Sequence, residues 1–528
     1  MKNKLLFGVL LIPALMTGPA FAQGNARALL QAADQAIGAS KVNSMQFTGS
    51  GRYSYLGQNF TVNDDWNRVD LKAMSGGPGY VLTIDYPSKS YKEEMIRTQG
   101  NNPRIGGGAG FPITGEQRAN AMANGNYAWT LNAQGQPQAQ NDQAETRQLF
   151  VAVSPYGFIK TALADPNATI ADREFVGTGR TLKVVSFTTM GKWRATGEFN
   201  NQNMLERVVT WIPSPMMGDL QVEIRYSDWR DVGNGIKAPY HIHMHQGDHP
   251  LIRGMNQLDV QATDVKVNVQ GAALQVPDAV RSAQPARVNI QTTKLADGIW
   301  LIAGGSHNSV AVEFKDFAAL IEAPLDDART LAVIAETKRL IPGKQIKYVV
   351  NTHHHWDHAG GLRAAYAEGA TIVTNEQNKN FYERVILVPQ SRNLSPDRLS
   401  TAPFATTGPG PGHLETYRDQ HAISDGNQSI ISYHVQGFQH AQDMAIIYLP
   451  KAKIVINADM GPPPAGAPAA QVNANTVALY NNIKRLKLDV VQHVPIHGNP
   501  SSQADFERTV GPVAAAARPA GGGEGGGG

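Results

Sequence analysis

The chain has 528 residues, none of them cysteine, and a formal net charge of +3. This length exceeds that of one typical domain, and the lack of cysteine excludes disulfide bonds and thiolate metal ligands. The 47 basic and 44 acidic residues nearly balance and form no basic cluster, so the composition gives no support for nucleic-acid binding.

The first 22 residues have the pattern of a secretory signal peptide of the bacterial type. Lys2 and Lys4 precede an apolar stretch over residues 5–16, and the sequence Ala-Phe-Ala ends at Ala22. The apolar stretch is shorter than the about 20 residues that a membrane-spanning helix needs. We therefore expect cleavage after Ala22, a mature protein that begins at Gln23 without a membrane-spanning segment, and a location in the periplasm or outside the cell.

Residues 23–285 are predicted to form a β-rich N-terminal domain. Residues 26–37 have the apolar spacing of an amphipathic helix, and the sequence that follows alternates in short strands separated by glycine, asparagine and aspartate turns. The predicted strands include residues 45–55, 181–188, 205–212, 220–226 and 240–245. This pattern predicts one extended antiparallel sheet with a helix laid on it.

A local motif refines the expected shape of this domain. Residues 226–232 (Tyr-Ser-Asp-Trp-Arg-Asp-Val) and 235–240 (Gly-Ile-Lys-Ala-Pro-Tyr) are similar to a repeated feature of lipoprotein-carrier (LolA-like) half-barrels, which implies a half-barrel-like sheet. His241, His243 and His245 alternate along the next strand, but neighbours two residues apart lie about 7 Å apart along a strand. We interpret these histidines as an exposed sheet face and not as a metal site.

One short segment of the second half has the strongest pattern for metal binding. His353, His355 and Asp357 stand at alternate positions after residues 346–350, whose apolar run predicts a buried strand. Side chains at alternate positions of an extended chain point to one side, so these three side chains are expected to converge. His358 follows where the chain turns into a predicted helix, and it completes a His-x-His-x-Asp-His set.

Three more donor residues follow apolar runs later in the chain. His440 follows Gly-Phe-Gln, Asp459 follows the predicted strand 454–456, and His497 follows the run 490–494. The carboxyl ends of strands are where open α/β layers place their sites. A zinc ion takes three or four nitrogen, oxygen or sulfur donors, and a hydrolytic zinc site leaves one position open for water. Seven donors therefore suit two metal ions.

This set of motifs, His-x-His-x-Asp-His, Gly-x-x-His, Asp and His-Gly, resembles the metallo-β-lactamase-fold hydrolase superfamily. The resemblance covers about half of the chain and implies an αββα sandwich over residues 286–515, and thus an α+β protein. It also implies two zinc ions, with iron or manganese as alternatives. In this family pattern His353, His355 and His440 hold one ion, Asp357, His358 and His497 hold the second, and Asp459 bridges both.

Departures from the family pattern separate its branches. The absence of cysteine excludes the cysteine-ligand β-lactamases, and the bridging Asp459 is similar to glyoxalase II and related esterases, lactonases and thioesterases. His355 stands where flavodiiron oxygen reductases have a carboxylate, which disfavours redox iron chemistry. Glu322 replaces the aspartate that often follows the second strand, and we assign it no catalytic role. Pro462 replaces a tyrosine of quorum-signal lactonases, which disfavours that activity.

The resemblance implies an exported binuclear zinc hydrolase that cleaves an ester, lactone, thioester or amide bond of a small-molecule substrate. A metal-bridging hydroxide would be the nucleophile, because two metal ions lower the pKa of a shared water. Asp357 would both bind metal and orient the attacking water, and His307, in a loop after the first strand of the domain, would contact the substrate. Two alternatives stay open: a β-lactam-hydrolysing enzyme, and a non-catalytic periplasmic carrier of an apolar ligand with a vestigial metal site.

The remaining segments of the second half are assigned other roles. His354 and Trp356 point away from the donors on the alternation argument, so we interpret them as packing residues. Residues 388–418 are rich in proline, serine and glycine without periodicity, which predicts a loop that is either a lid or a surface excursion. Residues 516–528 form a glycine-rich tail that is expected to be disordered.

Overall fold

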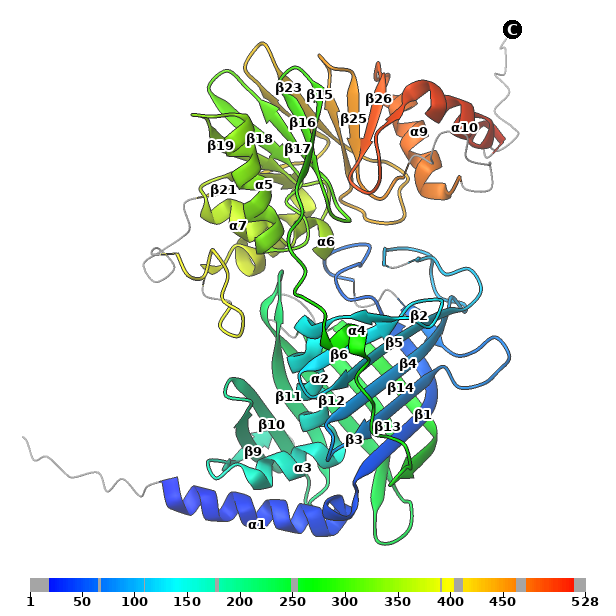
Figure 1. The fold of residues 1–528 in the computed structure, drawn as a ribbon, viewed down its shortest axis with the longest axis vertical. Coiled ribbons are helices and arrows are strands. Elements are labelled where there is room, and N and C mark those ends of the chain that lie inside the picture. The colour runs from blue at the N-terminus through cyan, green and yellow to red at the C-terminus, as the bar shows by residue number, and fades with distance from the viewer. Residues whose placement is uncertain are drawn as a thin grey trace, which may run out of the picture.

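The computed structural model places two β-rich parts of the chain one above the other along the long axis of the molecule (Figure 1). The structure describes residues 19–64, 68–108, 110–175, 180–247, 255–389, 392–402, 412–461 and 472–516. Most of the predicted signal peptide and nearly all of the predicted tail lie outside these described residues. Cleavage, export and tail disorder therefore stay predictions.

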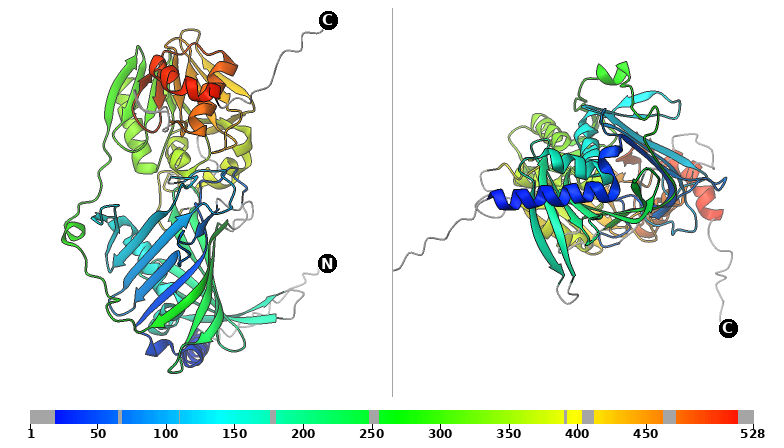
Figure 2. Two further views of the ribbon diagram at one scale, coloured as in Figure 1. Left: turned by 90° about the vertical axis from the view of Figure 1, so that its right-hand side faces the viewer. Right: turned by 90° about the horizontal axis from the view of Figure 1, so that it is seen from below.

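The N-terminal part is a single antiparallel sheet, as predicted. Its 14 strands follow the order β7-β6-β5-β4-β2-β1-β14-β13-β12-β11-β10-β9-β8, and β3 pairs with β1 and β4. The strands are β1 (Ser44–Ser54), β2 (Arg68–Leu71), β3 (Tyr80–Asp85), β4 (Ser90–Thr98), β5 (Gln117–Asn124), β6 (Tyr127–Leu131), β7 (Pro137–Ala139), β8 (Thr169–Phe175), β9 (Arg180–Thr189), β10 (Trp193–Phe199), β11 (Leu205–Ser214), β12 (Gly218–Asp231), β13 (Lys237–Gly247) and β14 (Met255–Val267). Figure 2 shows that the sheet is strongly curved.

Helices cover the concave face and the far end of this sheet (Figure 1). They are α1 (Pro19–Ile37), η1 (Ala39–Lys41), η2 (Asn141–Gln143), α2 (Ala144–Val153) and α3 (Pro155–Ala164). Leu30, Ala33 and Ile37 lie on one face of α1 at helical spacing and are buried in the same core as Phe158 of α3. Among the described residues, no helix combines the length and apolar character that crossing a membrane requires.

The C-terminal part contains two further sheets. The first, of seven strands, runs in chain order and contains β15 (Gln291–Ala296), β16 (Ile299–Ala303), β17 (Ser309–Glu313), β18 (Phe317–Ile321), β19 (Gln345–Val350), β20 (Thr371–Asn375) and β21 (His413–Tyr417). The second, of six strands, contains β22 (Gln420–Ser424), β23 (Ser429–His434), β24 (Ala445–Leu449), β25 (Ile454–Asn457), β26 (Gln492–Pro495) and β27 (Ser501–Ser502). Within this sheet β22 pairs with β23, and β24 pairs with β25, as two antiparallel hairpins.

The two sheets pack face to face and carry helices on their outer sides, which confirms the predicted αββα sandwich. Val310 and Val312 of the first sheet share a core with Ile447 and Val455 of the second. The helices of this part are α5 (Asp327–Leu340), α6 (Trp356–Ala359), α7 (Leu362–Ala367), η3 (Glu376–Asn378), α8 (Lys379–Phe381), the π-helical turn η4 (Tyr382–Ile386), α9 (Ala474–Leu486) and α10 (Gln503–Ala516). The preceding helix α4 (Asp278–Arg281) packs instead on β6 and β7 of the N-terminal sheet. Helices α5 and α7 pack on the first sheet, and α9 and α10 pack on the second.

The segment 388–418 is only partly the loop that its composition predicts. Its last residues form β21, which pairs in parallel with β20, so the loop prediction is wrong there. The strand was missed because its sequence, His-Leu-Glu-Thr-Tyr, is short and mostly polar. Among residues 392–402, the backbone N–H groups of Asn393 and Leu394 donate to Asp219 of β12 at 3.0 Å. This described part of the segment docks onto the N-terminal sheet.

Candidate metal centre

Three histidines form a buried group at the end of the first C-terminal sheet. The chain leaves β19 in extended form, so His353 and His355 point to the same side, and His440 approaches from the loop before β24. One ring nitrogen from each of the three lies within 4.8 Å of the others. His353 and His355 are fully buried and His440 nearly so.

The unpaired atoms of this group fit a cation. His353 Nε2, His355 Nδ1 and His440 Nε2 are buried and have no hydrogen-bond partner. Burial lowers the pKa of His353 and His355 well below the usual value for histidine, so both rings are neutral and each keeps a nitrogen lone pair. A buried polar atom without a partner costs about 1–3 kcal/mol, and a metal ion would satisfy all three at once.

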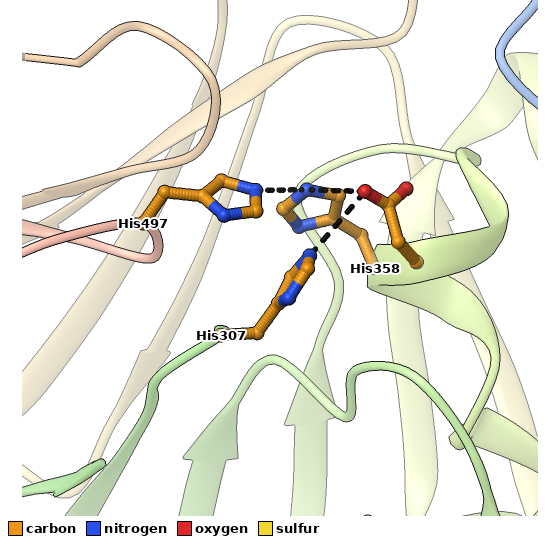
Figure 3. Close-up of side chains that lie close together, drawn as sticks. His307, His358 and His497 are labelled. Carbon is orange, nitrogen blue, oxygen red and sulfur yellow. Dashed lines mark hydrogen bonds and ion pairs between the residues drawn. The ribbon is translucent and has the colours of Figure 1, made fainter. Parts of the chain in front are cut away.

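A second group of donors lies beside the first. The Nε2 atoms of His358, on α6, and His497, after β26, are 3.1 Å apart. Asp357 Oδ2 is 3.9 Å from His358 Nε2 and 3.3 Å from His307 Nε2. Figure 3 shows the rings of His307, His358 and His497 turned toward a common point, although they come from three different loops and turns. The four ligand atoms lie within 4.8 Å of one another.

Asp459 lies between the two groups. Its Oδ2 atom is 3.4 Å from His353 Nε2, 3.5 Å from His440 Nε2 and 2.9 Å from His358 Nε2. Its Oδ1 atom is 3.2 Å from His497 Nε2. Burial alone would raise the pKa of this carboxyl, but His358 and His440 hold it well below its usual range. The backbone of Asp459 is left-handed, with φ 52°, a conformation that aspartate tolerates better than most residues and that is common at functional sites.

Glu322 supports the second group from outside. It follows β18 with φ 69° and is fully buried. Its Oε2 atom is 2.8 Å from His358 Nδ1, and its Oε1 atom accepts a hydrogen bond of 2.7 Å from the Thr352 N–H. Glu322 is not among the residues that line the cavity. Its contact with His358 makes it a positioning residue, because a partner on one ring nitrogen determines which nitrogen faces the metal.

His354, interpreted as a packing residue, is turned away from the donors, whereas Trp356 lines the same cavity as Asp357 and His440. His354 is buried, and its Nδ1 atom is 2.6 Å from Asp443 Oδ1, whose other oxygen accepts from Asn378 Nδ2 at 2.6 Å. Trp356 packs so closely against Gly57 that a Cβ atom there would lie 2.3 Å from the indole ring. His354 and Trp356 therefore anchor the ligand loop on opposite sides.

The loop that follows β1 of the N-terminal sheet contacts the donor residues of this centre. The Gly57 carbonyl accepts from the Trp356 N–H at 3.1 Å, and the Asn59 carbonyl accepts from His355 Nε2 at 2.8 Å. The second bond places the proton of His355 on Nε2, which leaves Nδ1 with its lone pair toward the other donors. Gln58 Nε2 donates to Asp357 Oδ1 at 2.7 Å.

A second N-terminal segment closes against the same side chains. A Cβ atom on Gly107 would lie 2.5 Å from His440 Cε1 and 2.8 Å from His355 Cε1, so only glycine fits there. The Gly106 N–H donates to the Gln439 carbonyl at 2.7 Å, and the Gly107 N–H donates to the Gln58 carbonyl at 2.7 Å. Sequence reasoning missed these contacts, because no motif links either segment to the histidines about 300 residues away.

We expect Gln58→Ala to lower zinc affinity at the second group about 10- to 100-fold, the usual effect of removing an outer partner of a metal ligand. The Asp357 carboxylate would lose its only fixed hydrogen bond from the N-terminal sheet among the contacts that the structure describes. Competition with a chromogenic chelator measures the affinity, and the visible spectrum of the cobalt form reports the coordination. Asn63→Ala, an exposed change in the same loop, is the control; equal affinity in both variants would refute the role of Gln58.

A cavity of about 690 Å³ opens onto the centre between the two parts of the chain. The C-terminal part contributes Asp357, His440, Asp459 and His497 to its wall, and the N-terminal part contributes residues that include Tyr55 and Gln58. A small molecule in this cavity would therefore contact both domains.

The histidine group on β13 lies apart from this centre. His241 Nε2 and Asp259 Oδ1 are 2.6 Å apart, and His243 Nδ1 is 3.4 Å from the same oxygen. His241 Nδ1 is 2.9 Å from Ser227 Oγ, and the side chains are partly exposed. The three histidines lie on a partly exposed face of the sheet, but His241, His243 and Asp259 offer ligand atoms within 4.8 Å of one another and could also hold a metal ion, so the interpretation that this is not a metal site stays a prediction.

Comparisons with known proteins agree with this geometry. Residues 302–491 match the family model of the metallo-beta-lactamase superfamily. The chain is similar to a metallo-beta-lactamase from Hirschia baltica (18% identity, 42% of this chain and 96% of that chain, TM-score 0.30) and to the metallo-beta-lactamase FIM-1 from Pseudomonas aeruginosa in its mono-zinc form (22%, 44% and 99%, TM-score 0.31). It is also similar to a metallo-beta-lactamase from Pontibacter korlensis (17%, 44% and 100%, TM-score 0.31). No curated protein matches the chain.

The family match and the αββα layers define the C-terminal part as a metallo-beta-lactamase superfamily domain. Most of the His/Asp groups that could bind metal lie within the matched residues 302–491, which supports a metal-dependent activity for this part of the chain. The family model covers none of the N-terminal sheet, so the resemblance of this sheet to lipoprotein carriers stays a prediction.

Proposed function

We propose that the protein is an exported hydrolase that uses two zinc ions to cleave an ester, lactone, thioester or amide bond of a small molecule. The observation that carries this proposal is the position of Asp459, whose carboxylate oxygens lie within 3.5 Å of ring nitrogens from both donor groups. One carboxylate facing both groups suits a pair of ions better than a single ion. Export is supported by the signal-like pattern of residues 1–22.

The seven donor residues divide between two ions, and each of them then has a ligand atom on a metal. His353, His355 and His440 would hold the first ion, Asp357, His358 and His497 would hold the second, and Asp459 would touch both. Ions bound there would polarise a carbonyl group and lower the pKa of a water molecule. Histidine and carboxylate sets also accept iron or manganese, so the metal is an outcome of the test.

Asp357 and His307 are the residues of the chain best placed to handle the reactants. Burial would raise the pKa of the Asp357 carboxyl, but the hydrogen bond from His307 and the charge of His358 hold it far below its usual range. Asp357 therefore stays ionised, and Gln58 fixes its Oδ1 atom, so the carboxylate can orient an attacking water. His307 Nε2 lies 3.3 Å from Asp357 Oδ2 but is buried and is not among the residues that line the cavity, so this ring would reach a substrate only where the substrate binds at Asp357.

The proposal is tested on protein purified from the periplasmic fraction of an expressing bacterium, where its recovery tests export. Elemental analysis should give two zinc ions per chain, and a panel of a chromogenic ester, a lactone, a thioester, an anilide and nitrocefin should show hydrolysis of one of the first four. His353→Ala should abolish that activity, whereas His413→Ala, which removes an exposed histidine of β21, should not. Hydrolysis of nitrocefin alone would favour a β-lactamase, and zinc-free protein inactive on the whole panel would refute the proposal.

A further inference from the structure

A second cavity lies inside the N-terminal sheet and meets the cavity of the metal centre. Its volume is about 260 Å³, and it is enclosed by the concave face of the sheet and by residues of α2 and α3. Tyr53, Ile212, Gln246 and Gln257 line both cavities. These four residues form a collar between the two cavities, in which the Gln246 side chain donates a hydrogen bond to Gln257 Oε1.

The strand register shows that the second cavity extends away from the metal centre. On β3 and β4 its wall residues are cross-strand partners at successive levels: Tyr80 with Met95, Leu82 with Glu93, and Ile84 with Tyr91. The same levels of β3 pair with Gly49, Phe47 and Met45 of β1, so they lie progressively farther from Tyr53 and from the loop that enters the centre. From Tyr53 to the last level β1 covers roughly 25 Å, at about 3.3 Å per residue.

The wall of this cavity is suited to an uncharged apolar chain. Apolar side chains from several strands of the curved sheet line the cavity, among them Leu82, Ile84, Ile224, Ile242 and Met244. Phe150 of α2 also lines it. No lysine, arginine or histidine is among its described lining residues. Its one carboxyl, Glu93, already accepts a hydrogen bond of 2.8 Å from the Tyr80 hydroxyl, and burial raises its pKa. An anionic chain end would lie against Glu93 without a cation, so the favoured occupant is a hydrocarbon tail.

We propose that one substrate occupies both cavities: an acyl chain lies in the sheet cavity, and the carbonyl to which it is attached lies at Asp459 and its neighbouring donors. This inference rests on the proposed hydrolase function and names its substrate class, a long-chain acyl ester, thioester or amide. Water adds across the bond between the acyl carbon and the leaving heteroatom. The acyl carbon gains the hydroxyl and becomes a carboxylic acid, and the heteroatom gains the proton and departs through the wider metal cavity.

The first test is a series of umbelliferyl esters from butanoyl to dodecanoyl with the zinc-loaded enzyme. We expect kcat/KM to rise about fourfold for each added methylene group, the gain from burying that much apolar surface. Met95→Trp and Met244→Trp would fill the sheet cavity and should remove the gain in kcat/KM with chain length. Ile96→Trp, at the next position of β4 where the side chain points to the other face, should keep it. A flat chain-length profile in the unaltered enzyme would overturn the inference.

A binding measurement separates this inference from the proposed reaction. The fluorescence of cis-parinaric acid, a polyene fatty acid, should rise on binding to the unaltered protein and to Ile96→Trp, and should not rise with Met95→Trp or Met244→Trp. Circular dichroism and zinc content confirm that both cavity variants fold. The absence of binding to the unaltered protein would overturn the acyl site even if short esters were hydrolysed. Binding with the expected variant pattern, without hydrolysis of any ester, would support the acyl site and refute the proposed esterase reaction.

Discussion

Asp459→Ala is expected to leave the protein with one zinc ion per chain and to lower kcat by at least about three orders of magnitude. The side chain is the only one among the described residues whose oxygens approach ring nitrogens of both donor groups, from 2.9 to 3.5 Å. Removing it would leave the ring nitrogens of His358 and His497 facing each other without an anion between them. A metal ion contributes several kcal/mol to transition-state stabilisation, and each 1.36 kcal/mol is tenfold in rate.

Zinc stoichiometry by elemental analysis and single-turnover rates measure the two effects separately. Asp419→Ala, which removes an exposed aspartate near the start of β22, is the matched control and should retain both ions and full turnover. Asp459→Asn adds a second comparison, because the amide keeps the shape and removes the charge. If Asp459→Ala still bound two ions at unchanged affinity, Asp459 would not be the residue that the two metals share.

The donor residues could be predicted from the sequence because their chemistry and spacing are local. His353, His355 and Asp357 follow a strand at alternate positions, so the period of an extended chain alone brings them together. His440, Asp459 and His497 each follow an apolar run, and the structure places His440 and His497 in two neighbouring donor groups with Asp459 between them. The sandwich of layers was implied by the family resemblance that these motifs carry, and the two C-terminal sheets confirm it. The role of these seven donor residues as metal ligands is tested by the experiments described above.

The supporting residues could not be predicted, because their positions depend on packing between distant parts of the chain. Gln58 and Asn59 reach the centre only because β1 ends beneath it, and the curvature of a 14-stranded sheet is not visible in any window of sequence. His307 was assigned to the edge of the site and lies within hydrogen-bond reach of Asp357. The collar between the two cavities likewise joins β1, β11, β13 and β14, which are separated by up to about 200 residues.

Glu322 shows a different limit of sequence reasoning. Its position was recognised as a departure from the family pattern, but its contacts depend on a left-handed turn of φ 69° that aims the carboxylate back at His358. The longer glutamate side chain spans the distance to both His358 Nδ1 and the Thr352 N–H. The residue type alone could not distinguish this arrangement from a solvent-exposed carboxylate.

We therefore expect Glu322→Ala to destabilise the folded protein by about 3–5 kcal/mol, the cost of removing one partner of a buried ionic pair. The change would leave the Thr352 N–H without its acceptor and the His358 ring without the group that orients it. Burial would lower the pKa of His358, but Asp459 and Glu322 raise it well above the usual value, so the metal-free protein depends on both carboxylates to hold a buried positive charge. The zinc affinity of the second group should also fall about 10- to 100-fold.

Urea denaturation of the metal-free variant measures the first effect, and chelator competition of the refolded protein measures the second. Glu322→Gln keeps the side-chain volume and one carbonyl oxygen, but it lacks the second carboxylate oxygen that accepts from His358 or the Thr352 N–H. Its losses of stability and of zinc affinity should therefore be smaller than those of Glu322→Ala. Glu383→Ala, an exposed change on η4, is the control for loss of a carboxylate. A Glu322→Ala variant as stable as this control would mean that His358 is held by the backbone alone. In that case the second donor group would be held in place by the backbone of α6 and by the contact of the N-terminal loop with Asp357. Gln58, which makes that contact, would then be the main residue that positions the group.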